Sequence, residues 1–128
     1  TNISESIPPQ ALLSQLCDYF SAMSRTILDN EGTLDKYIGD SIMAFWGAPN
    51  TLENHAYLAC KSALICQDLI FNLSHVWKRE GKYPFRTRMG IHTGKVIVGN
   101  MGYEKQINYT VLGDNVNLAS RLESINKY

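Results

Sequence analysis

The sequence predicts an α+β sandwich in which helices cover strands that pair through hairpins. Its 128 residues correspond to one domain or part of one. Hydrophobic residues make up 45% and charged residues 19%, a mixture typical of a globular protein. Apolar positions at helical spacing alternate with short β-type runs in the order α, β, β, α, β, β, β, α. Hairpin-paired strands between helices favour the α+β class over a doubly wound parallel sheet.

The first half of the chain predicts a helix, a hairpin and a second helix. In the expected helix 9–30, apolar residues follow one another at steps of three and four: Leu12, Leu16, Phe20, Met23 and Ile27. Strands are expected at 33–38 and 42–46, because Gly39 and Asp40 between two apolar runs indicate a hairpin. The helix expected at 53–80 has an inner face rich in small residues: Ala56, Ala59, Cys60, Ala63, Leu64, Gln67, Ile70 and Trp77.

The second half predicts three strands and a last helix. Strands are expected at 85–91 and 96–98, interrupted by Gly90 and Gly94, and at 107–112. Gly113 and Asp114 open the last helix, whose inward residues should be Val116, Ala119, Leu122 and Ile125. Since a helix begins almost at residue 1 and another is cut by the end of the chain, we expect 1–128 to be a partial domain, truncated at both ends.

Charge and composition argue against several classes of protein. Twelve basic residues balance twelve acidic ones, which disfavours a protein that coats nucleic acid or an anionic membrane. Apolar runs are far shorter than the roughly 20 residues of a membrane span, so we expect no direct membrane contact from this segment. Three cysteines without a C-x-x-C pair, Cys17, Cys60 and Cys66, are expected to be buried thiols in the cytoplasm. Other segments could still anchor the parent chain to a membrane.

Two polar residues of the first hairpin are candidate ligand contacts. Asp40 at the tip would suit a hard cation such as Mg²⁺, although aspartate is also common in turns for purely conformational reasons. Alternation along the strand places Lys36 on the face shared with Ile38, beside apolar Leu34. A lysine in such surroundings is either a residue that protects a sheet edge or a ligand contact.

Asn117 and Arg121 are a second candidate pair. Four residues apart on a helix, they lie one above the other, on a face different from the apolar one. An arginine fork and a neutral amide could bind phosphate and ribose, but a solvated helix face is equally compatible with the pair. The segment 90–95, G-I-H-T-G-K, does not fit a phosphate loop, because it has three residues between its glycines instead of four. His92 is expected to serve packing or the turn.

Three long segments together resemble the class III adenylate/guanylate cyclase catalytic domain. They are D-K-Y-I-G-D-S-I-M-A-F-W-G-A-P at 35–49, R-M-G-I-H-T-G at 88–94 and Y-T-V-L-G-D-N-V-N-L-A-S-R-L-E at 109–123. Their order and spacing match the family over essentially the whole chain. The resemblance implies a ferredoxin-like palm, an antiparallel-rich sheet with helices on one face. It also implies head-to-tail homodimers with active sites between the two copies.

The resemblance assigns a role to each candidate residue. Asp40 matches the second of two metal-binding aspartates, and Lys36 matches the lysine that recognises the purine. Asn117 matches the asparagine that orients the ribose, and Arg121 the arginine that stabilises the pentavalent phosphorus. The first metal aspartate would precede the segment 1–9, and a lysine that contacts the terminal phosphates would follow residue 128. We therefore expect the 128 residues alone to be inactive.

By the same resemblance, Thr110 matches the second purine-selecting position, where many members of the family have aspartate and a bicarbonate-responsive subgroup has threonine or serine. Lysine can donate to adenine N1 and threonine can accept from the 6-amino group, whereas guanine presents the opposite pattern. The pair therefore predicts ATP as substrate. Without an opposing carboxylate, Lys36 should also attract a small anion, so we expect stimulation by bicarbonate.

The implied reaction is attack of the ATP 3′-hydroxyl on the α-phosphorus, which gives 3′,5′-cyclic AMP and pyrophosphate with the help of two Mg²⁺ or Mn²⁺ ions. Three alternatives remain at this point. A diguanylate cyclase would need a Gly-Gly-Asp/Glu-Glu-Phe segment, which is absent. The others are a catalytically inactive cyclase-like module that dimerises and binds nucleotide, and a plain protein-interaction domain.

Overall fold

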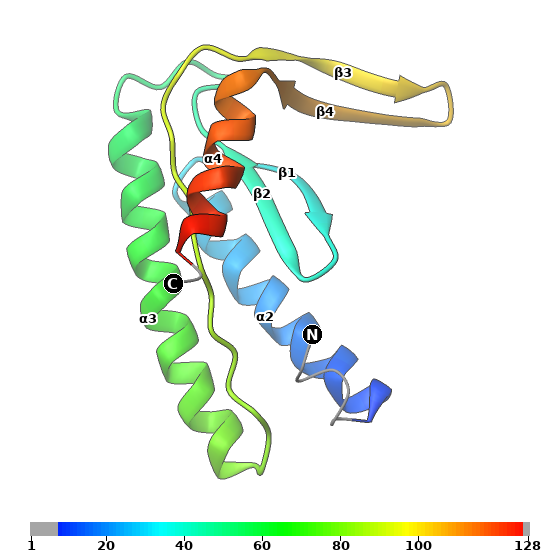
Figure 1. Ribbon diagram of the computed structural model, residues 1–128, viewed down its shortest axis with the longest axis vertical. Helices are drawn as coiled ribbons and strands as arrows, with labels where there is room; N and C mark the ends of the chain where they lie inside the picture. Colours follow the sequence, from blue (N-terminus) through cyan, green and yellow to red (C-terminus); the bar gives the residue numbers. More distant parts are fainter. Residues whose placement is uncertain (1–7, 127–128) are drawn as a thin grey trace.

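The computed structural model describes residues 8–126, which form helices and antiparallel hairpins in an α+β arrangement (Figure 1). The predicted class and the antiparallel pairing are confirmed. The strands form two separate two-stranded sheets, β1–β2 and β3–β4. Within 8–126, none of the helices is long and apolar enough to span a membrane. The elements in chain order are α2 (Pro9–Asp29), β1 (Thr33–Ile38), β2 (Ser41–Phe45), α3 (His55–Arg79), β3 (Ile97–Tyr103), β4 (Gln106–Leu112) and α4 (Asp114–Ile125).

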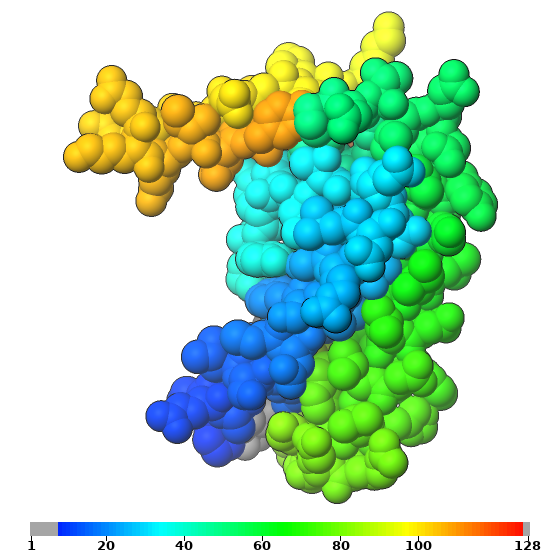
Figure 2. All heavy atoms as spheres, turned by 180° about the vertical axis from the view of Figure 1, so that it is seen from behind, coloured from blue at the N-terminus to red at the C-terminus, as the bar shows by residue number. Residues whose placement is uncertain are grey.

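The hydrophobic core lies between α2 and α3, which pack against each other (Figures 1 and 2). Its most deeply buried large side chain is Trp77, which is 2% exposed. Phe85, from the segment after α3, covers the core by contacting the rings of Trp77 and Tyr19. Aromatic side chains of this size contribute much of the buried area that holds two helices together. The buried cluster comprises Tyr19, Met23, Cys66, Ile70 and Trp77.

The helix faces were predicted only in part. On α3, Ile70 and Trp77 are buried as expected, but Leu64 is 70% exposed. The buried side of α3 instead includes Ser62, whose hydroxyl donates to the carbonyl of Leu58 at 2.7 Å. A hydroxyl satisfied within its own helix can be buried at little cost, and a pattern of apolar residues does not detect it.

The expectation of three buried thiols is wrong for two of them. Cys17 and Cys60 are exposed, and only Cys66 is buried. Burial raises the pKa of the Cys66 thiol, and a hydrogen bond with Thr26 opposes this shift. The last helix also differs from its prediction, because no residue of α4 is fully buried and Ile125 is 67% exposed.

The strand predicted at 85–91 does not form. Residues 82–96 run without regular secondary structure beside α3 (Figure 1). Side chains from α3 and from the residue after α4 bind the carbonyl oxygens of this segment where a neighbouring strand would otherwise do so. Gln67 donates to Thr87 O at 3.0 Å, and Asn126 donates to Met89 O at 2.6 Å. The apolar alternation reflects packing against the helices, and no described strand lies alongside to complete a ladder.

The hairpin β3–β4 extends away from the helices as an arm (Figures 1 and 2). The run predicted at 96–98 is the beginning of β3, and the strand predicted at 107–112 is β4 almost unchanged. Register runs from Ile97 opposite Leu112 to Tyr103 opposite Gln106.

The hairpin β1–β2 turns at Gly39 and Asp40, as predicted, with Ile38 opposite Ser41. Gly39 has φ 60°, the left-handed region that glycine adopts without strain. Tyr37 fixes the hairpin to α2: its hydroxyl shares a hydrogen bond with the Ser24 hydroxyl at 2.7 Å, and its ring stacks on Phe20. The position of the Asp40 turn therefore depends on contacts with α2.

Replacing Tyr37 by phenylalanine should lower the free energy of unfolding by about 1 kcal/mol, because the buried Ser24 hydroxyl would lose its partner. Urea unfolding of the full-length protein measures the change. Tyr57→Phe is the matched control, since Tyr57 is 64% exposed and its replacement should have an effect below about 0.5 kcal/mol. Equal destabilisation by both variants would show that the hydrogen bond does not hold the hairpin in place.

Candidate functional site

Lys36 and Thr110 come together around a third residue, Asp35. The Thr110 hydroxyl on β4 donates a hydrogen bond to Oδ2 of Asp35 on β1. The Lys36 ammonium lies 3.7 Å from Oδ1 of the same carboxylate. Asp35 has a completely buried side chain and Thr110 is 3% exposed, whereas the Lys36 side chain is 40% exposed. The two hairpins thus meet at a lysine, a carboxylate and a hydroxyl.

A β-bulge in β1 explains why Asp35 faces β4. Leu34 lies opposite Ala44 and Lys36 opposite Met43, so Asp35 is the extra residue between two consecutive pairs. A bulge bends its strand locally and redirects the side chain of the inserted residue. The expectation that Lys36 lies beside Leu34 on one face of the strand is therefore wrong. The two residues pair with adjacent residues of β2, so they lie on opposite faces.

The structure removes the basis for expecting an anion at Lys36. That expectation required a lysine without an opposing carboxylate, and Asp35 supplies one at 3.7 Å. A partly buried ammonium beside a carboxylate is already compensated and attracts a further anion weakly. Stimulation by bicarbonate would therefore have to arise at another cation.

Asp40 is exposed at the tip of the β1–β2 hairpin. Burial, and to a smaller extent the negative charge of Asp40, raises the pKa of the Tyr19 hydroxyl. Within 8–126, no group of three histidine, cysteine or acidic residues is close enough to hold a metal ion. Asp40 therefore offers a carboxylate oxygen of the kind that Mg²⁺ prefers, and the described residues do not gather three such ligands.

Asn117 and Arg121 lie on the exposed side of α4, one turn apart, as predicted. Neither side chain forms a hydrogen bond or an ion pair with another residue of the described segment, so both are available to a ligand. The described contacts do not join this pair to Lys36 and Thr110. Asn117 and Arg121 lie on α4, whereas Lys36 and Thr110 lie where β1 and β4 meet.

The segment 88–95 positions α4. Arg88 forms an ion pair with Glu123 at 2.9 Å. Gly90 passes so close to the helix that a Cβ there would lie 2.2 Å from the carbonyl oxygen of Ala119. Only glycine permits this approach without displacing the helix. The segment 88–95 therefore positions Arg121 indirectly, because it holds the helix that carries this residue.

His92 has the structural role expected of it. Its Nε2 lies 2.8 Å from Oδ1 of Asn115, and Nδ2 of Asn115 donates to Lys95 O at 2.7 Å. Together these bonds attach the first turn of α4 to the segment before β3. Asn115 and Asp35 lie inside the segments 109–123 and 35–49, and their roles could not be expected from the sequence because their partners are distant in the chain.

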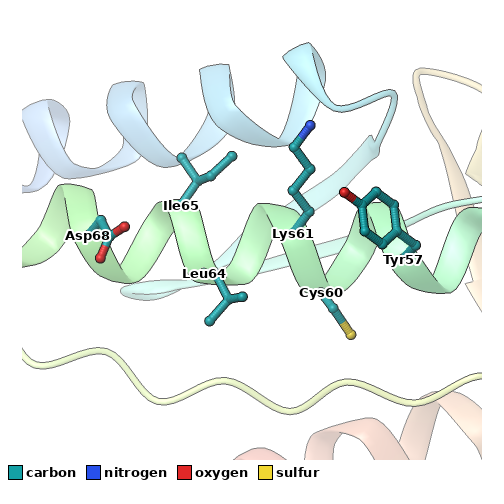
Figure 3. Close-up of a pocket in the computed structure, with 6 residues that line it drawn as sticks. All are labelled: Tyr57, Cys60, Lys61, Leu64, Ile65 and Asp68. Atoms are coloured by element: carbon teal, nitrogen blue, oxygen red, sulfur yellow. The ribbon is translucent and has the colours of Figure 1, made fainter.

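A surface hollow of about 380 Å³ lies on α3, away from these residues (Figure 3). All six side chains around it come from one helix: Tyr57, Cys60, Lys61, Leu64, Ile65 and Asp68. Leu64 and Cys60 point to one side of α3, while Ile65 and Lys61 point to the other (Figure 3). Polar groups therefore do not converge there as they do in a binding site.

Comparison with known proteins gives a consistent result. The family described as "Adenylate and Guanylate cyclase catalytic domain" matches residues 1–128. Adenylate cyclase 1 of Rhizobium meliloti (strain 1021) is 39% identical over 127 residues, which cover 99% of this chain and 19% of that protein.

Two solved structures share the fold. The adenylyl cyclase CyaB from P. aeruginosa has a TM-score of 0.91 at 36% identity, and covers 97% of this chain and 65% of its own. The guanylyl cyclase Cya2 has a TM-score of 0.88 at 34% identity, and covers 97% of this chain and 63% of its own. The chain thus spans less than two thirds of each of these relatives. They include both adenylyl and guanylyl cyclases, so similarity alone does not indicate the base.

Proposed function

Because the chain belongs to the adenylate and guanylate cyclase catalytic domain family, we propose that it is the catalytic domain of an adenylate cyclase. The proposed reaction converts ATP to 3′,5′-cyclic AMP and pyrophosphate. The observation that carries the choice of ATP is the meeting of Lys36 and Thr110 at Asp35.

The donors and acceptors of this pair are complementary to adenine. The Lys36 ammonium donates only, which suits the unprotonated N1 of adenine. The Thr110 oxygen can accept from the 6-amino group. Guanine carries a proton on N1 and a carbonyl at C6, so it would meet a donor with a donor and an acceptor with an acceptor. Sites built to hydrogen-bond one pattern reject the opposite one strongly, because buried polar groups are then left unpaired.

In the full-length protein, kcat/KM for ATP should exceed that for GTP at least about tenfold, or roughly 1.4 kcal/mol of differential transition-state binding. Parallel initial-rate assays of cyclic AMP and cyclic GMP formation measure the ratio. Thr110→Ser should preserve the preference because it keeps the hydroxyl, whereas Thr110→Val should reduce it. Equal kcat/KM for both nucleotides in the wild type would contradict the assignment of the base.

The remaining residues act on the sugar and the phosphates. We propose that the Asn117 amide orients the ribose so that the 3′-oxygen faces the α-phosphorus. The Arg121 guanidinium would then stabilise negative charge that develops on the phosphoryl oxygens. Asp40 would hold Mg²⁺ or Mn²⁺ as one ligand of a two-ion site. These ions, when bound, lower the pKa of the 3′-hydroxyl and neutralise the departing pyrophosphate.

We further propose that the complete site forms between two copies arranged head to tail. In such a dimer, Asp40 of one copy would face Lys36, Thr110, Asn117 and Arg121 of the other. Two observations support this arrangement: Asp40 has no described acidic cluster around it, and Arg121 has no described partner in its own chain. A two-fold dimer brings the same two surfaces together twice, so it would contain two equivalent sites.

Within 8–126, no three possible metal ligands gather at Asp40, which also favours a second candidate, an inactive cyclase-like module that dimerises and binds nucleotide. Turnover of bound ATP distinguishes the two functions. An active domain releases pyrophosphate from ATP, whereas an inactive module would bind ATP in equilibrium dialysis without turnover in either Mg²⁺ or Mn²⁺.

A further inference from the structure

Asp35 is a buried carboxylate that has no role in the proposed reaction. Its side chain is inaccessible to solvent, and one of its oxygens, Oδ1, has no hydrogen-bond partner in the described part of the chain. The nearest cation is the Lys36 ammonium at 3.7 Å, beyond hydrogen-bonding distance. Its other oxygen accepts from Thr110.

Packing alone does not account for this residue. A buried carboxylate loses its hydration and destabilises a fold unless charges and hydrogen bonds compensate it fully. Here Lys36 offsets the charge from 3.7 Å, but Oδ1 has no hydrogen bond in the described part of the chain, and an apolar side chain could fill the same place between β1 and β4. The bulge that directs Asp35 toward Thr110 also interrupts the β1–β2 ladder. A costly group held in an irregular strand next to the proposed base-recognition pair indicates a functional role.

The hydrogen bond from Thr110 determines what this hydroxyl can recognise. A threonine hydroxyl has one proton to donate and two lone pairs with which to accept. A carboxylate has no proton, so in its bond with Asp35 the threonine must be the donor. The proton is then committed, and only lone pairs remain for a nucleotide base. Thr110 held in this way accepts from an amino group and repels a carbonyl oxygen.

We propose that Asp35 is a positioning residue that sets the base preference, by fixing the Thr110 hydroxyl as an acceptor. This inference rests on the proposed function, in which Lys36 and Thr110 contact the purine. It adds that the discrimination between a 6-amino and a 6-oxo purine by Thr110 depends on Asp35, a residue that itself does not touch the base.

Asp35→Asn in the full-length protein tests the role at nearly constant shape. The asparagine Nδ2 can donate to the Thr110 oxygen, which releases the threonine proton toward the base. The ratio of kcat/KM for ATP to that for GTP should fall about tenfold, the effect of one reversed hydrogen bond. Asp18→Asn is the control, since this exposed carboxylate on α2 should leave the ratio unchanged.

A double-mutant cycle separates positioning from general damage to the fold. In a Thr110→Val background no hydroxyl remains to be oriented, so Asp35→Asn should change the ratio less than about twofold. A purely structural Asp35 would lower both activities equally in either background and leave the ratio constant. Asp35→Ser, which can also donate to Thr110, is the second variant if the asparagine form does not fold. Failure of both variants to fold would assign Asp35 to stability and overturn the proposal.

The outcomes distinguish this inference from the proposed function. If Thr110→Val alters the ratio and Asp35→Asn does not, the positioning role is wrong and the function stands. If the wild type uses ATP and GTP equally, or neither, the proposed function itself fails.

Discussion

Arg121→Ala in the full-length protein should lower kcat for cyclic AMP formation by about 10²–10³-fold. Arg121 is exposed on α4 and has no partner among the described residues, so its guanidinium is available to the phosphates. Its charge matters most when negative charge develops in the transition state, and the loss should therefore appear in kcat more than in KM.

Arg79→Ala is the matched control for this experiment. Arg79 is an exposed arginine in the last turn of α3, and its removal should leave kcat within about twofold. Equal effects of the two substitutions would indicate a general loss of charge. An Arg121→Ala enzyme with wild-type kcat would exclude this residue from the reaction.

Mixing Asp40→Ala and Arg121→Ala proteins should restore activity that neither has alone. In the proposed head-to-tail dimer, a heterodimer has one site with both substitutions and one intact site. Random exchange of equal amounts gives about half heterodimers, so activity should reach about a quarter of the wild-type value.

The complementation requires a check that subunits exchange. Two differently tagged variants, purified through both tags in sequence, isolate the heterodimer directly. Such a heterodimer should have about half the wild-type activity, because one of its two sites is intact. An inactive heterodimer would show that Asp40 and Arg121 serve the same site of one chain.

The sequence was sufficient to predict features that depend on local chemistry. Gly39 and Asp40 between apolar runs predicted a hairpin, and the structure confirms it, with β2 beginning at Ser41 and Gly39 in the left-handed region. The exposed placement of Asn117 and Arg121 followed from their spacing relative to the apolar residues of α4. Both features are determined within a few residues of the chain.

Features that depend on contacts between distant segments could not be predicted in this way. Residues 85–91 have the composition of a strand, but the hydrogen bonds from Gln67 and Asn126 replace a ladder. Asp35 looked like one more residue of a regular strand, and only the register with β2 reveals the bulge. Its partner Thr110 is 75 residues away in the chain, so no local pattern could connect them.

The contacts of Asp35 with Lys36 and Thr110 show why contacts between distant segments matter for function. Lys36 was a candidate from its place in the strand and Thr110 from the resemblance, and their isolated chemistry suggested an unpaired cation. Once Asp35 is included, the same residues form a neutral pair with a hydroxyl of defined orientation. The chemistry expected at the site thus loses the attraction for an anion and keeps the selection of a base.

The most direct test of the adenylate cyclase assignment is a competition assay. The purified full-length protein is given equal concentrations of ATP and GTP with Mg²⁺, and again with Mn²⁺, and cyclic AMP and cyclic GMP are quantified by mass spectrometry. We expect cyclic AMP in at least about tenfold excess over cyclic GMP with whichever ion supports turnover. Cyclic GMP in equal or greater amount, or the absence of either product with both ions, would contradict the assignment.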